Sequence, residues 1–143
     1  MELKFKKLHP GAVIPAYQTK GSAGFDLHSI DNVAIPTGKT VLVHTGLSVA
    51  VPEGYELQIR PRSGVSLKTG LMIKNSPGTI DSDYRGEIGI IVYNTGEKFG
   101  HYVNYHDRIA QGVMVPVVQA TIVEVEELDD TERGVGGFGS TGK

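Results

Sequence analysis

The 143-residue sequence contains no cysteine, so it can form no disulfide framework, no thiol nucleophile and no cysteine-based zinc site. It has no excess of basic residues either, because 14 Lys and Arg against 16 Asp and Glu give a net charge of −2. This balance argues against a general DNA- or RNA-binding protein, although a few arginines could still hold a small anion.

Long hydrophobic runs are also lacking. No apolar run reaches transmembrane length, and the N-terminus MELKFKKLHPGAV has no apolar signal core. We therefore expect neither a membrane nor a nucleic-acid polymer as a partner. The expected compartment is the cytoplasm, or the host cytoplasm if the source is a virus or phage.

Several catalytic patterns are missing as well. None of the five histidines falls in an HExxH or paired metal-ligand spacing, and there is no GxSxG nucleophile elbow. The final residues GFGSTGK match most of the Walker A spacing. A P-loop needs a Ser or Thr after the lysine and then a helix, so we expect no P-loop here.

Turn-forming residues are abundant: 19 Gly and 7 Pro separate short β-rich segments. This pattern is typical of an all-β sandwich, barrel or jelly roll. Strands are expected at 3–8, 33–35, 40–51, 55–60, 71–74, 87–93, 102–103, 112–118 and 121–128. Residues 40–51 read as one or two strands around Gly46, and Pro116 indicates that 112–118 is an edge or bulged strand.

One short helix is expected, from Ser63 to Thr69, with Ser63 as its N-cap and Gly70 as its stop. Towards the C-terminus, residues 124–132 carry six of the 16 acidic residues, and the last 11 residues include five glycines. Such a tail cannot form a core. We predict a β jelly-roll or distorted β-barrel domain over 1–128 and a flexible Gly-rich C-terminal arm over 129–143.

The stretch 75–94, NSPGTIDSDYRGEIGIIVYN, opens with a turn and ends in a β-rich run from Glu87. Side chains alternate in a strand or tight hairpin, so Asp81 and Asp83 are expected to point the same way. Two like charges so close together suggest a cation, a bound water or base chemistry. A solvated Asx turn is the simpler alternative.

Three further places carry charged residues that could act on a ligand. Arg62 precedes the predicted helix, where free amides and a guanidinium could bind an anion; a plain helix cap is the alternative. Arg108 could act similarly or could pair with Asp107 or a hairpin carboxylate. Asp26 lies between apolar neighbours, either as a placed carboxylate or as an outward residue at a strand end.

The C-terminal arm is open to two interpretations. It could be a disordered linker remnant. It could instead be a flexible clamp, in which Arg133, Ser140, Thr141 and glycine amides bind phosphate oxygens and Phe138 stacks on a ring.

Five stretches together resemble the signature of the homotrimeric dUTP diphosphatases (dUTPases), which is five short motifs in fixed order. They read AGFDLHS (23–29), PRSGVSLK (61–68), NSPGTIDSDYRGEI (75–88), DRIAQ (107–111) and RGVGGFGSTG (133–142). The resemblance implies a trimeric jelly-roll enzyme that hydrolyses dUTP to dUMP and pyrophosphate. Water would attack the α-phosphate in line, with assistance from Mg²⁺.

The resemblance also implies a role for each residue of the third motif. Asp81 would be the general base for the attacking water. Tyr84 would pack against the deoxyribose and leave no room for a 2′-hydroxyl. Asn75 would read the uracil together with main-chain groups of the hairpin at Gly78 and Ile80.

The other motifs would hold the phosphates and close the site. The phosphate contacts implied are Arg62, Ser63, Gly64 and Gln111, and Arg108 would be a phosphate contact or a structural pair. Asp26 would meet Mg²⁺ through water, with the metal carried by the triphosphate rather than by a protein cage. The arm residues implied are Arg133, Phe138, Gly139, Ser140 and Thr141, with Phe138 over the uracil of a site between subunits.

Two alternative functions can be separated from this one. A dCTP deaminase resembles the same fold and shares the GxID segment, but it places a catalytic glutamate ten residues after the aspartate, where this chain has Ile91. A non-catalytic trimeric jelly-roll binding module would have no reason to carry Asp81, Tyr84 and the Arg133–Phe138 tail together. Release of pyrophosphate from dUTP distinguishes all three.

Overall fold

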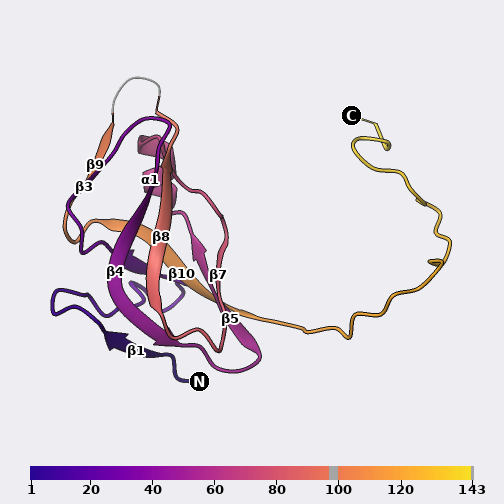
Figure 1. Cartoon of the computed structure of the whole chain (residues 1–143), viewed down its shortest axis with the longest axis horizontal. Coiled ribbons are helices and arrows are strands. Elements are labelled where there is room, and N and C mark those ends of the chain that lie inside the picture. Colours follow the sequence, from indigo (N-terminus) through magenta and orange to yellow (C-terminus); the bar gives the residue numbers. More distant parts are fainter. Residues whose placement is uncertain (97–99, 143) are drawn as a thin grey trace.

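The computed structural model describes residues 1–96 and 100–142 (Figure 1). The elements in this part of the chain are β1 (Lys4–Lys7), β2 (Gly24–His28), β3 (Val33–Ile35), β4 (Thr40–Ala50), β5 (Tyr55–Arg60), α1 (Ser63–Lys68), β6 (Leu71–Ile73), β7 (Gly78–Ile80), β8 (Glu87–Asn94), β9 (His101–Val103) and β10 (Arg108–Pro116). None of the helices in the described ranges is both long and apolar enough to span a membrane.

Two antiparallel sheets make up most of the domain. One has the strand order β1-β4-β8-β6, the other β2-β10-β5-β7, and β3 pairs with β9 in a small third sheet. The predicted all-β jelly-roll class with one short helix is therefore confirmed. The long strands β4 and β8 run side by side through the domain, with α1 at one end of it (Figure 1).

The core lies where the inward faces of the strands meet. In β8 burial alternates residue by residue, so Ile88, Ile90 and Val92 point inward. Buried polar groups in the core have partners: the Thr45 hydroxyl donates to the Ile88 carbonyl (2.6 Å), and the Asn94 side-chain amide donates to a main-chain carbonyl on β3 (2.8 Å). This packing gives the loops at the ends of the strands a rigid support.

The helix differs from the prediction at its start. It runs from Ser63 to Lys68, Arg62 occupies the N-cap position, and no side chain caps the helix by a hydrogen bond. The prediction that Ser63 is the N-cap is therefore wrong. Arg62 takes this position because its extended backbone links β5 to the helix while its side chain is drawn to a carboxylate on β2.

Two strand predictions near the C-terminus are also wrong. β10 is a central strand between β2 and β5, not an edge strand, and Pro116 is tolerated because it is the last residue of the strand. The register shift of β10 lies between Arg108 and Ala110, before the predicted segment 112–118. Residues 121–128 form no strand in this chain and are exposed, because they leave the domain and meet no sheet edge with which to pair (Figure 1).

Candidate active site

The connection from β7 to β8 forms one side of a groove. The groove is lined by Leu42, Thr79, Ile80, Asp81, Tyr84, Glu87, Gly89 and Ile91. The lining combines the aliphatic residues Leu42, Ile80 and Ile91 with Asp81 and Tyr84. A carboxylate beside an apolar surface and an aromatic ring is a combination that can hold a ring-shaped ligand next to a proton acceptor.

Asp81 and Asp83 do not point the same way, contrary to the prediction. Asp83 lines a different groove, together with Glu53 and Arg85. The chain turns between the two aspartates, and the Tyr84 amide donates to the Asp81 carbonyl (3.2 Å). Strand alternation fails here because the strand ends at Ile80, one residue before Asp81.

Tyr84 is held across the turn. Its hydroxyl donates to the main-chain carbonyl of Glu87 (3.0 Å), and 43% of the residue remains exposed. Part of Tyr84 is therefore accessible in the groove that Asp81 also lines.

Asn75 and Gly78 lie close together at the start of β7. Gly78 is buried and pairs with Ile59, and a methyl group on Gly78 would stand 3.2 Å from the side-chain nitrogen of Asn75. The fold thus brings the Asn75 amide against the main chain of the hairpin, as reading a base by both groups would require.

A second cluster lies on the sheet β2-β10-β5-β7, at β2, β10 and the end of β5. The Arg62 guanidinium donates through Nε to one carboxylate oxygen of Asp26 (2.7 Å), and Arg108 donates through Nη1 to the other (3.3 Å). Arg62 also donates to the main-chain carbonyl of Arg108 (3.0 Å). Gln111 stands beside them on β10, paired with Asp26, and its amide donates to the Pro61 carbonyl (2.9 Å).

This cluster decides between the alternatives that the sequence left open. Asp26 is a placed carboxylate with a side chain 13% exposed, and Arg108 pairs with Asp26 rather than with Asp107 or a hairpin carboxylate. Ser63 and Gly64 follow Arg62 at the surface, with open space around Gly64. Two arginines with one carboxylate leave a surface of net positive charge that suits an anionic ligand.

His28 is a residue of this cluster that sequence reasoning missed. It lies two residues after Asp26 on β2, so both side chains leave the same face of the strand. Its Nδ1 atom is buried without a hydrogen-bond partner among the described residues. Burial lowers the pKa of His28 below 6.5, while the nearby Asp26 carboxylate opposes that shift.

The arm stands apart from both groups. It extends away from the domain (Figure 1). Phe138 is fully exposed. Its glycines make a series of tight turns, and Arg133 donates through Nε to the Gly136 carbonyl (2.8 Å). Gly139, Ser140 and Thr141 are exposed in the same segment.

Within one chain the hairpin and the arginine cluster are separate. On β5, Leu57 pairs with Ile80, the last residue before Asp81. Arg60 of the same strand pairs with Gln111 of β10, and Gln111 pairs with Asp26 of β2. These two levels differ by three residues of β5, which is roughly 10 Å at the rise of a strand. In the described part of the chain, no hydrogen bond or ion pair joins Asp81 or Tyr84 to the cluster.

Comparisons with known proteins agree on one family. The model of the dUTPase family matches residues 11–142. The deoxyuridine 5'-triphosphate nucleotidohydrolase of Nautilia profundicola is 60% identical over all of both chains, and that of Wolinella succinogenes is 57% identical over all of this chain and 95% of its own.

Solved structures give the same result. A mutant dUTPase of Staphylococcus bacteriophage 80alpha with dUpNHpp has a TM-score of 0.88 and is 32% identical, covering 99% of each chain. A mutant dUTPase from phage phi11 of S. aureus, described with a structural Mg(II) ion, has a TM-score of 0.84 and is 28% identical, covering 91% of this chain and 100% of its own.

Proposed function

This chain belongs to the dUTPase family, and we propose that it hydrolyses dUTP to dUMP and pyrophosphate. The observation that carries the proposal is the groove that Asp81 and Tyr84 line together with aliphatic residues. Each of the five motifs includes residues that are exposed or partly exposed.

Asp81 is the general base. It accepts a proton from a water molecule as the water oxygen attacks the α-phosphorus in line. The new bond joins that oxygen to the α-phosphorus, the bond to the bridging oxygen of the β-phosphate breaks, and pyrophosphate leaves. The groove position of Asp81, next to the surface that holds the sugar, supports this role.

The hairpin selects the nucleoside. Tyr84 packs against the deoxyribose, and a 2′-hydroxyl would meet the ring. The Asn75 amide reads the uracil with the main chain at Gly78 and Ile80, which the short distance between Asn75 and Gly78 supports.

The phosphates bind at the second cluster. The residues in this role are Arg62, Ser63, Gly64, Arg108 and Gln111. Two guanidinium groups beside each other offset part of the triphosphate charge, and Asp26 holds them in orientation.

Mg²⁺ fits this cluster through water. Both Asp26 oxygens accept an arginine hydrogen bond, and each keeps a lone pair for a metal-bound water. The described residues contain no group of three or more His, Asp or Glu side chains that could hold the ion directly. Bound with the triphosphate, the metal would supply charge neutralisation during attack.

The complete site forms between subunits of a homotrimer. Within one chain the hairpin and the arginine cluster stand apart and the arm extends away from both, and a neighbouring copy would bring the three together. Exposed apolar side chains at Val118 (95%) and Ile122 (96%) support association, because such residues are stabilised by burial against a partner. Arg133, Phe138, Gly139, Ser140 and Thr141 would then close a neighbour's site.

The deciding experiment measures the products formed from dUTP by the purified protein with Mg²⁺. Formation of dUMP and pyrophosphate in equal amounts is expected, with UTP, dCTP and dTTP as poor substrates. Conversion of dCTP to dUTP with release of ammonia would instead identify a deaminase, and turnover of neither nucleotide would identify a binding module. The apolar Ile91 in the groove favours hydrolysis, since a deaminase needs a carboxylate there.

A further inference from the structure

We propose that Gly86 is a positioning residue: because it lacks a side chain, it leaves the space that the Tyr84 ring occupies, and it thereby sets the sugar selectivity of the site. The proposal rests on the proposed function. Gly86 lies between Tyr84 and the first residue of β8, in the turn that carries Asp81.

The Tyr84 ring occupies the space that any side chain at position 86 would need. A Cβ atom on Gly86 would stand 2.5 Å from the Tyr84 Cζ and 2.9 Å from its Cε2, and nearer still to the hydroxyl. These separations are far inside van der Waals contact. Gly86 has no positive φ, so the need for glycine here is the ring and not the backbone conformation.

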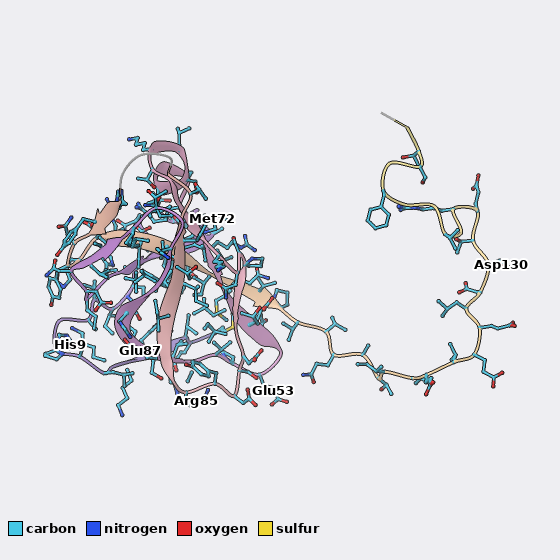
Figure 2. All side chains as sticks on the ribbon, turned by 45° about the horizontal axis from the view of Figure 1, so that its top comes forward. His9, Glu53, Met72, Arg85, Glu87 and Asp130 are labelled. Carbon is cyan, nitrogen blue, oxygen red and sulfur yellow. The ribbon has the colours of Figure 1, made fainter. Side chains whose placement is uncertain are left out.

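The backbone around Gly86 is anchored on both sides. Before it, the carbonyl of Arg85 accepts a hydrogen bond from the buried Ser48 hydroxyl (2.7 Å). After it, Glu87 pairs with Ser48 across the sheet, and its carboxylate accepts from the Gly46 amide (2.8 Å). Figure 2 labels Arg85 and Glu87, the residues on either side of Gly86.

The Arg85 side chain fixes the turn itself. Its Nη1 donates to the carbonyls of Ser82 (2.7 Å) and Tyr84 (2.9 Å). An added methyl group at position 86 therefore meets a backbone that cannot yield, and the ring must move instead. The ring is free to do so because it is half exposed and its hydroxyl makes one hydrogen bond, to the Glu87 carbonyl.

The test is a double-mutant cycle. Gly86→Ala, Tyr84→Ala and the double variant are compared for kcat and KM with dUTP and with UTP. Gly21→Ala is the matched control, since nothing lies within 4 Å of a Cβ there and Gly21 has no positive φ. Thermal unfolding of each variant separates folding from selectivity.

We expect Gly86→Ala to lower kcat/KM for dUTP by about 10²-fold, the typical effect of displacing a positioning group by about 1 Å. The preference for dUTP over UTP should fall with it, while Gly21→Ala behaves as wild type. In the Tyr84→Ala background, where the ring is gone, the Gly86 substitution should cause no further loss.

Two outcomes overturn the proposal while leaving the enzyme's function intact: unchanged selectivity in Gly86→Ala, or an equal loss with and without the Tyr84 ring. If the wild-type protein does not hydrolyse dUTP, the proposed function fails by itself. A crystal structure of Gly86→Ala then decides the steric claim, which a ring in its original place contradicts.

Discussion

Mixing two inactive chains tests whether the arm acts on a neighbouring subunit. The first chain carries Asp81→Asn with an intact arm, and the second keeps Asp81 but ends after Glu132. The 16 residues between Pro116 and Arg133 span at most roughly 55 Å when extended. Because this length alone allows the arm to reach its own site, only a functional test can assign it to a partner.

The expected recovery follows from symmetry. In trimers assembled at random from equal amounts of the two chains, a site that takes its base and its arm from different subunits is complete in about a quarter of cases. Each homotrimer should be nearly inactive. Co-refolded mixtures should therefore regain about a quarter of the wild-type rate of pyrophosphate release.

Two controls make the result decisive. Mass spectrometry must first detect trimers of mixed composition. Pairing the truncated chain with one that has both changes should restore nothing, because that mixture contains no arm. If mixed trimers form and remain as inactive as their parents, the arm does not act in trans, and Arg133 and Phe138 must be assigned to their own subunit.

Three further predictions concern single residues. Asp81→Asn should keep the fold and dUTP binding, measured calorimetrically, but lose about 10²–10⁴-fold in turnover as expected for removal of a general base; near-normal turnover would exclude that role. Asp26→Asn should lower stability to urea by about 1–3 kcal/mol, because Arg62 and Arg108 lose their shared charged partner, and should raise the Mg²⁺ concentration needed for activity; an unchanged metal requirement would remove Asp26 from the metal's surroundings. The lowered pKa of His28 means that the unfolded chain binds its proton first as pH falls, so stability should drop below about pH 6.5; His28→Gln should flatten that slope in unfolding measurements, and an unaltered slope would assign it to other groups.

Much of the fold could be predicted because the signals were local. Leu57 and Ile59 alternate with the polar residues Gln58 and Arg60 in the sequence, and in β5 the two apolar residues are buried. Frequent Gly and Pro indicated short strands and an all-β class, which the two sheets confirm. These features depend on side-chain period and turn chemistry, both of which a single sequence contains.

The wrong N-cap prediction and the missed His28 share one cause, which is a distant contact that overrides or is invisible to local preference. Ser63 is a good N-cap by type, but Arg62 is drawn across to Asp26 on another strand and occupies the cap position. His28 carried no sequence signal, because its importance comes from burial beside Asp26 and the two arginines. Periodicity cannot report which strands become neighbours.

The segment 121–128 shows the same limit in a different form. Val123 and Val125 alternate with Glu124 and Glu126 as in a strand, yet the segment forms none and is exposed within one chain. A β pattern is a preference for a pleated, half-buried surface, so it needs a sheet edge to be realised. The pattern predicts a strand only where such an edge is available, and a second subunit can provide one.

A symmetric assembly of identical chains would explain why the motifs are separate within one chain. Along β5, the hairpin with Asp81 and Tyr84 follows the residue paired with Leu57, whereas Asp26 and Arg62 lie near Arg60. Phe138 lies away from the domain and is exposed. A head-to-tail contact between identical chains joins different surfaces of each copy, and a closed ring of three repeats that junction three times. One chain with three separate part-sites can therefore build three equivalent active sites, provided that each interface brings a hairpin, an arginine cluster and an arm together.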